Sequence, residues 1–190
     1  MTPSVPALAP RLAAARAAVA PRIGEAPEIA MILGSGLGQL ADAVEGATHI
    51  PYAEIPGFPV STAPSHAGRF VLGRLFGRQA ALMQGRVHLY EGWSAQDVAL
   101  PVWLMAAMGA RTLVVTNAAG ALNPALKPGV PMLIEDHLNL TGANPLIGPN
   151  DDALGPRFPD MSRAYAPELR ELARDAAMKI GEDLPAGIYA

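Results

Sequence analysis

Cysteine is absent from the 190 residues, which excludes disulfide bonds, thiolate nucleophiles and cysteine-ligated zinc. Charged residues are sparse, at 16% of the chain, and the basic ones are scattered. With a formal net charge of −3, the charge pattern gives no reason to expect nucleic acid or an anionic membrane as a partner. No run of about 18 apolar residues occurs, and Arg11 and Arg16 interrupt the apolar stretch that a secretory signal needs. We therefore expect a cytoplasmic protein.

Several catalytic signatures are also missing. The sequence contains no H-E-x-x-H, and its four histidines lack ligand-like spacing, so we expect no metal site. The G-x-S-x-G elbow of many hydrolases does not occur. Asp136 and His137 are adjacent and could form a catalytic pair, but a structural role at a strand end is the interpretation we favour.

Apolar residues make up 51% of the chain, which suffices for a core. Periodicity predicts strands near 29–33, 69–75, 79–84, 86–90, 112–116 and 131–140, and helices at 8–19, 38–44, 95–108 and 166–180. Ser94 is a plausible N-cap of the third of these helices. A hairpin around Gly77-Arg78 makes the sheet mixed. We expect one α/β domain over 1–190, a mixed twisted β-sheet flanked by helices, with residues 1–7 frayed.

The segment 85–92 carries the most chemistry. If it is extended, alternation places Arg86, His88 and Tyr90 on one face. A guanidinium fork suits phosphate, an imidazole adds a donor or a charge, and a phenol suits a sugar hydroxyl. The alternative is an edge strand whose polar face meets water.

Two glycine-bearing turns indicate the same kind of ligand. The apolar strand 29–33 runs into Gly34-Ser35-Gly36-Leu37-Gly38, where backbone N–H groups and the Ser35 hydroxyl can hold an anion. This spacing matches neither the dinucleotide fingerprint nor the P-loop, and an ordinary tight turn is the alternative. The strand 112–116 runs into Asn117-Ala118-Ala119-Gly120, whose small residues allow close approach of a ligand.

From about Ile29 onward, the sequence resembles the trimeric purine nucleoside phosphorylases. Segments in the order of that family are Gly34-Ser35-Gly36-Leu37-Gly38, Ile55-Pro56-Gly57-Phe58-Pro59, Ser65-His66-Ala67-Gly68, Gly85-Arg86-Val87-His88-Leu89-Tyr90-Glu91-Gly92, Thr116-Asn117-Ala118-Ala119-Gly120 and Asp136-His137-Leu138-Asn139-Leu140. Several motifs in order over most of the chain are far more specific than any one of them.

The resemblance implies phosphate-dependent cleavage of the glycosidic bond of purine (deoxy)ribonucleosides, a pentosyltransferase reaction of purine salvage. It implies a homotrimer, no cofactor, and inorganic phosphate as co-substrate. The site residues that it implies are His88 and Asn117 for catalysis; Ser35, His66, Arg86, His88 and Ala118 for phosphate; Tyr90 for ribose; Ala118 and Ala119 for the purine; and Leu154 as the cover given to a neighbouring subunit. An exposed loop histidine is the alternative for His66.

Family members continue well past the segment that resembles Gly187-Ile188-Tyr189-Ala190. The resemblance places the other purine-binding residues there, so we expect the domain to lack its C-terminal part and the 190-residue chain alone to be inactive. We also expect the strand near 187–190 to be left without neighbours. Two alternatives stay open: a catalytically silent phosphate-binding or oligomerisation module with the same fold, and a 5′-methylthioadenosine phosphorylase.

Overall fold

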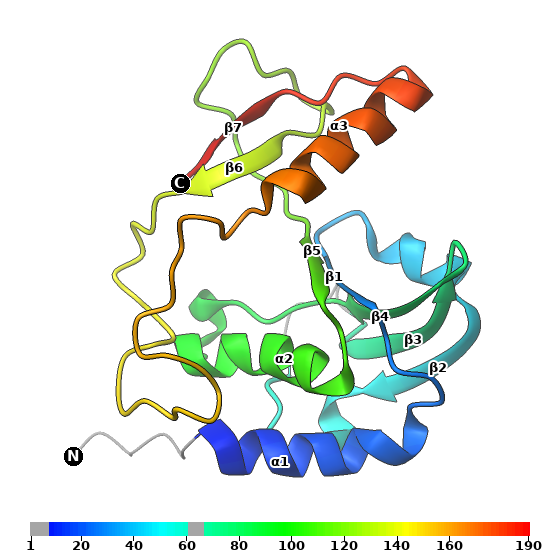
Figure 1. Ribbon diagram of the computed structural model, residues 1–190, viewed down its shortest axis with the longest axis vertical. Helices are drawn as coiled ribbons and strands as arrows, with labels where there is room; N and C mark the ends of the chain where they lie inside the picture. The colour runs from blue at the N-terminus through cyan, green and yellow to red at the C-terminus, as the bar shows by residue number, and fades with distance from the viewer. Residues whose placement is uncertain (1–7, 61–66) are drawn as a thin grey trace. The chain divides into compact units, whose positions relative to one another are not determined.

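The computed structural model describes residues 8–60 and 67–190 (Figure 1). The predicted fraying of residues 1–7 and the predicted phosphate ligand His66 lie outside these ranges. The chain forms two compact units, Met1–Ala118 with Asn144–Leu154, and Ala119–Ala143 with Gly155–Ala190. A single domain over 1–190 stays a prediction, and each unit is described by itself.

The first unit is built on a five-stranded sheet. Its strands, in spatial order, are β2 (Glu45–Pro51), β3 (Arg69–Leu75), β4 (Arg78–Gln84), β1 (Ile29–Leu33) and β5 (Thr112–Val115). The strand β1 pairs in parallel with both β4 and β5, whereas β3 pairs antiparallel with β2 and β4. The predicted α/β class with a mixed sheet is therefore confirmed.

The hairpin expected around Gly77-Arg78 joins β3 to β4, with its turn one residue earlier. Leu75 pairs with Arg78, so the turn consists of Phe76 and Gly77 alone. Both have positive φ, 49° and 80°, as the favoured two-residue turns between right-twisted strands require. This turn sets the register that carries β4 toward Gly85.

Alternation divides the sheet into two apolar faces. Phe70 and Leu72 of β3 belong to one core cluster, and Val71 and Leu75 belong to the other. The first face packs against helices α1 (Leu8–Val19) and α2 (Ala95–Met108), both predicted from the sequence. The second packs against Ala41 in the 3₁₀ helix Gly38–Ala43.

In the first unit, two local predictions were wrong and one strand was missed. The segment 38–44 forms a 3₁₀ helix rather than an α-helix. The segment 86–90 is not a strand, because a 3₁₀ helix begins at Leu89 and no partner strand pairs with it in the described chain. The strand β2 was not predicted, since its side chains are mostly exposed and Gly46 interrupts the pattern.

The second unit contains a two-stranded parallel sheet and one α-helix. Its elements are β6 (Leu133–His137), β7 (Ala186–Tyr189) and α3 (Pro167–Ile180). β6 is thus shorter than the strand predicted over 131–140. The prediction that the strand near 187–190 lacks neighbours was wrong, because β7 pairs with β6 along its length. No helix in the described ranges is long and apolar enough to cross a membrane.

The adjacent pair Asp136 and His137 lies at the end of β6. Nδ1 of His137 is 3.2 Å from the Tyr165 hydroxyl and 4.0 Å from Oδ1 of Asp136, and the His137 and Tyr165 rings meet edge to face. These contacts join β6 to the segment before α3. They fit the structural role favoured from the sequence.

Candidate phosphate-binding site

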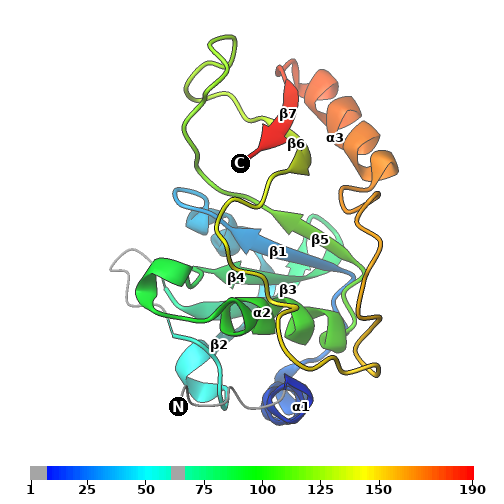
Figure 2. The same ribbon diagram turned by 90° about the vertical axis from the view of Figure 1, so that its left-hand side faces the viewer.

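Three neighbouring parallel strands of the first unit end at the same edge of the sheet. These are β4, β1 and β5, which lie side by side in Figure 2. Ligands of open α/β sheets collect outside the carboxyl ends of such strands. The residues that follow the three strands are Gly85–Arg86, Gly34–Ser35 and Thr116–Asn117.

Thr116 joins the ends of β1 and β5. Its hydroxyl accepts a hydrogen bond from the Gly34 N–H at 2.8 Å and donates to the Ile32 carbonyl at 3.1 Å. A Cβ added to Gly34 would lie 2.6 Å from the Thr116 carbonyl oxygen and 2.8 Å from Cα of Asn117. Only glycine therefore allows the two turns to approach this closely.

Arg86 brings the end of β4 to the same place. Its Nη1 donates to the Thr116 carbonyl at 2.8 Å, and its Nε lies 3.2 Å from Nε2 of His88. Although 86–90 is not a strand, its side chains alternate in direction over its first half. Val87, between Arg86 and His88 in the chain, is 4% exposed. The guanidinium is thereby oriented on two of its edges at the end of the sheet.

His88 is held by Glu91, a residue that the sequence analysis did not single out. One carboxylate oxygen, Oε1, accepts the His88 backbone N–H at 2.8 Å and lies 2.9 Å from Nδ1 of the ring. Because a guanidinium N–H only donates, Nε2 of His88 accepts from Arg86 and Nδ1 carries the proton. The Glu91 side chain is 2% exposed. The three-residue spacing of a capping box was the available sequence indication.

Tyr90 stays beside His88, although by a different route from the one predicted. The two rings stack with centroids 4.7 Å apart and an interplanar angle of 16°. The 3₁₀ turn, rather than strand alternation, places them together. Tyr90 is 78% exposed, so its ring and hydroxyl stand at the surface next to the imidazole.

The remaining predicted site residues differ in their surroundings. Ser35 and Ala118 are exposed in the first unit, and Asn117 is half-buried. Ala119 is exposed and belongs to the second unit. Leu154 is half-buried and packs against the core cluster under α1 and α2 of its own unit.

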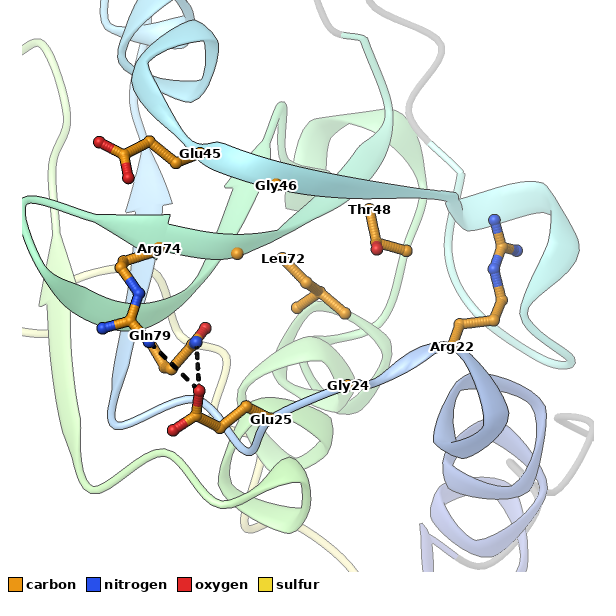
Figure 3. Close-up of a pocket in the computed structure, with 10 residues that line it drawn as sticks. Arg22, Gly24, Glu25, Glu45, Gly46, Thr48, Leu72, Arg74 and Gln79 are labelled. Atoms are coloured by element: carbon orange, nitrogen blue, oxygen red, sulfur yellow. Dashed lines mark hydrogen bonds and ion pairs between the residues drawn. The ribbon is translucent and has the colours of Figure 1, made fainter.

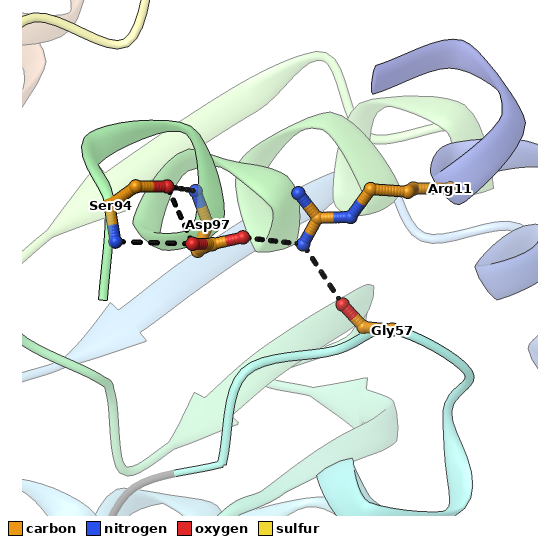
Figure 4. Close-up of polar contacts among 4 residues, drawn as sticks. All are labelled: Arg11, Gly57, Ser94 and Asp97. Carbon is orange, nitrogen blue, oxygen red and sulfur yellow. Dashed lines mark hydrogen bonds and ion pairs between the residues drawn. The ribbon is translucent and has the colours of Figure 1, made fainter. Parts of the chain in front are cut away.

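A polar network fixes the start of α2 at Ser94, three residues after Glu91 in the chain (Figure 4). Asp97 accepts from the Ser94 backbone N–H at 3.1 Å and from Nη2 of Arg11 at 2.6 Å, and Arg11 also donates to the Gly57 carbonyl at 3.0 Å. The Asp97 N–H donates to the Ser94 hydroxyl oxygen at 3.1 Å, which confirms Ser94 as N-cap. Burial alone would raise the pKa of Asp97, but the hydrogen bonds from Ser94 and Arg11 outweigh it and lower that pKa.

A surface hollow of about 390 Å³ lies at the amino ends of β2 and β4 and the carboxyl end of β3, which runs antiparallel to both (Figure 3). Gln79 near the start of β4 and Arg74 of β3 both donate to Oε2 of Glu25, at 2.6 and 3.4 Å. Of the predicted phosphate ligands within the described residues, namely Ser35, Arg86, His88 and Ala118, none lines the hollow, because they follow the carboxyl ends of β1, β4 and β5. Within the described residues, no three histidine or carboxylate side chains gather into a group that could hold a metal ion.

The family model of the phosphorylase superfamily matches residues 28–190. The chain belongs to the phosphorylase superfamily. Among superfamily members, it is 56% identical over 163 residues to purine nucleoside phosphorylase 1 of Geobacillus stearothermophilus, a match that covers 86% of this chain and 60% of the relative. It is 49% identical over 168 residues to the purine nucleoside phosphorylase of Bos taurus, covering 86% of this chain and 58% of that protein. The predicted resemblance is confirmed.

Solved superfamily structures give the same result. The purine nucleoside phosphorylase of Schistosoma mansoni in complex with acetate superposes with a TM-score of 0.89 at 41% identity, over 95% of this chain and 68% of that one. Isoform 2 from the same organism, in complex with cytosine and ribose-1-phosphate, gives 0.88 at 42% identity, over 95% and 65%. The chain thus spans about three fifths of the length of the curated relatives named above.

Proposed function

We propose that the protein cleaves the glycosidic bond of purine (deoxy)ribonucleosides with inorganic phosphate, releasing the free purine and (deoxy)ribose 1-phosphate. The observation that carries the proposal is the meeting of Arg86, the Gly34–Ser35 turn and the Thr116–Asn117 turn at one sheet edge. The purine nucleoside phosphorylases among its relatives support the choice of substrate, and solved members of the superfamily hold ribose-1-phosphate or hypoxanthine.

In the proposed site, phosphate lies against the Arg86 fork, His88, the Ser35 hydroxyl and the Ala118 N–H. Arginine suits this role because its planar donors match two phosphate oxygens at once. The Arg86 guanidinium is already oriented by Thr116 and His88, so little freedom is lost when an anion binds. His66 is proposed as a further phosphate ligand on the resemblance alone.

Chemistry follows from where charge develops. A phosphate oxygen attacks C1′ and forms the C–O bond of the sugar phosphate, while the electron pair of the C–N bond leaves with the purine, which then takes up a proton. The sugar gains positive charge in between, so a fixed anion beneath C1′ stabilises it. Tyr90, which stacks on His88, is proposed to contact the ribose, and Asn117 with Ala118 and Ala119 is proposed to face the purine.

Further parts of the proposal follow the resemblance. We propose a homotrimer in which Leu154 covers the sugar bound by a neighbouring subunit, a cytoplasmic location and a role in purine salvage. The reaction needs no cofactor in this scheme, because phosphate is the nucleophile. Sedimentation velocity tests the trimer: a stable monomer would contradict it.

The test is a coupled assay for hypoxanthine released from inosine, with and without phosphate, run beside calorimetric titration of phosphate into the protein. Phosphate-dependent release supports the proposal. Because the 190 residues alone are expected to be inactive, the assay is also run on a form extended to the length of the relatives. Phosphate binding without release from inosine, guanosine or 5′-methylthioadenosine in that longer form would overturn the proposed activity and favour a phosphate-binding module. Release of base from 5′-methylthioadenosine alone would reassign the substrate.

A further inference from the structure

Tyr52 is a buried phenol next to the candidate site. It directly follows β2, is 1% exposed, and donates its hydroxyl hydrogen to the Gly85 carbonyl at 2.7 Å. Burial raises its pKa far above the usual range, so the hydroxyl keeps its proton and remains a donor. A lone buried hydroxyl would be costly, and this bond satisfies it together with a buried backbone carbonyl.

The ring of Tyr52 is fixed from several sides. It packs on Phe58 and Phe70 with centroids 5.0 and 5.3 Å away, and those two rings also contact each other. Its backbone N–H donates to the Gly68 carbonyl at 2.8 Å. Phe58 belongs to the Ile55–Pro59 motif, to which the sequence analysis assigned no role. The position of the hydroxyl is therefore set by the core and not by the site.

The Gly85 carbonyl and the Arg86 N–H belong to one planar peptide group. A donor that fixes this carbonyl also fixes the plane from which the Arg86 side chain starts. Gly85 has φ of 95°, a conformation that glycine alone adopts readily, so the chain turns sharply here after β4. Without an anchor on the carbonyl, this peptide group would have more freedom to rotate.

We propose that Tyr52 is a positioning residue for phosphate binding, acting on Arg86 through the Gly85–Arg86 peptide group. The inference rests on the proposed phosphate site and deepens it. The Tyr52 hydroxyl anchors the peptide group through the Gly85 carbonyl, while Thr116 and His88 hold the guanidinium at the other end of the Arg86 side chain. Phosphate then meets an arginine whose two ends are both fixed.

The experiment compares calorimetric phosphate affinity and thermal unfolding in Tyr52→Phe and in a matched control. Tyr52→Phe removes only the hydroxyl, and we expect the phosphate dissociation constant to rise about threefold to tenfold, the worth of one ordinary hydrogen bond. Leu75→Ala removes a buried side chain from the other core cluster, beside the hairpin at Arg78, and leaves Tyr52 and its aromatic neighbours in place. It should therefore lower the melting temperature without changing phosphate affinity. Where turnover is measurable, Tyr52→Phe should raise KM for phosphate more than it lowers kcat.

Each outcome has a distinct meaning. No phosphate binding by the unaltered protein would sink the proposed site itself. Binding by the unaltered protein, with equal binding by folded Tyr52→Phe, would overturn the positioning role alone, as would equal weakening in Leu75→Ala. If Tyr52→Phe does not fold, Gly85→Ala strains the backbone of the same peptide group, because Gly85 has a φ of 95°. Weakened phosphate binding in a folded Gly85→Ala supports the role, and unchanged binding overturns it.

Discussion

The hydroxyl of Thr116 lies 2.8 Å from the backbone nitrogen of Gly34, and this contact joins the ends of two strands that are adjacent in the sheet but distant in the chain. The Thr116 carbonyl, in turn, accepts from Arg86. One residue at the end of β5 therefore holds both the turn that follows β1 and the arginine that follows β4. Changes at this contact should affect stability and phosphate binding together.

Gly34→Ala should destabilise the first unit. The new Cβ would meet backbone atoms of Thr116 and Asn117 at 2.6 to 2.9 Å, and backbone cannot rotate away. We expect a loss of about 1 to 3 kcal/mol in the free energy of unfolding, the usual cost of overpacking, together with weaker phosphate binding. Gly24→Ala is the control, because nothing lies within 4 Å of its added Cβ. Urea unfolding of the two variants measures their stability. An unchanged midpoint in Gly34→Ala would contradict the close approach of the two turns.

Arg86→Ala should weaken phosphate binding by roughly tenfold to a hundredfold, since a charge-assisted hydrogen bond contributes about 1.5 to 3 kcal/mol. Arg86→Lys keeps the charge but loses the planar fork of donors, so its phosphate affinity should lie between those of the unaltered protein and Arg86→Ala. Arg78→Ala is the matched control: Arg78 starts β4 at the opposite edge and pairs with Glu28 at 3.0 Å. Titration calorimetry decides, and equal affinities for Arg86→Ala and Arg78→Ala would rule out the clamp.

The ring of His88 should carry its proton on Nδ1 when no phosphate is bound. Nδ1 faces the Glu91 carboxylate, and Nε2 accepts from Arg86. Nitrogen-15 NMR of the imidazole reads the tautomer directly. Glu91→Ala removes the acceptor 2.9 Å away and should admit the second tautomer. A proton found on Nε2 of the unaltered, phosphate-free protein would show that the ring is oriented otherwise.

Asp97 should make stability depend on pH at the acid end. Its pKa in the folded chain is lowered from the ordinary value of 3.8, so the folded state binds this proton less readily than the unfolded state. The stability that Asp97 contributes is thus complete well above 3.8 and is lost as the pH falls through the lowered pKa. Urea unfolding of the unaltered protein and Asp97→Asn, from about pH 6 to about pH 3, should show their difference shrink as the pH falls. A difference that stays constant with pH would disprove that Asp97 makes stability depend on pH. Arg11→Ala removes one of the donors to Asp97 and should make the pH dependence smaller.

The features that sequence reasoning predicted well are those set by near neighbours. The helix Ala95–Met108 has its cap at Ser94 and the carboxylate of Asp97 three residues later, so four consecutive residues are enough to predict where it begins. The hairpin at Phe76–Gly77 and the strand β1 are similarly local. Alternation also brought Arg86 and His88 to one side correctly.

What sequence reasoning missed depends on contacts across the fold. The strand β2 has few buried side chains, and its pairing with β3 decides its structure. The burial of the Glu91 carboxylate follows from its neighbours in space, and the bond from Tyr52 to Gly85 spans 33 positions. Periodicity carries no information about such pairs.

The same distance along the chain has a kinetic meaning. Gly34 and Thr116 are 82 positions apart, so the anion site cannot exist before β1, β4 and β5 have come together. The site therefore forms at the same stage of folding as the sheet, and no local segment can form it alone. The amide hydrogen of Gly34 should exchange with solvent only when its bond to the Thr116 hydroxyl opens, so its exchange rate measures how often the two turns separate.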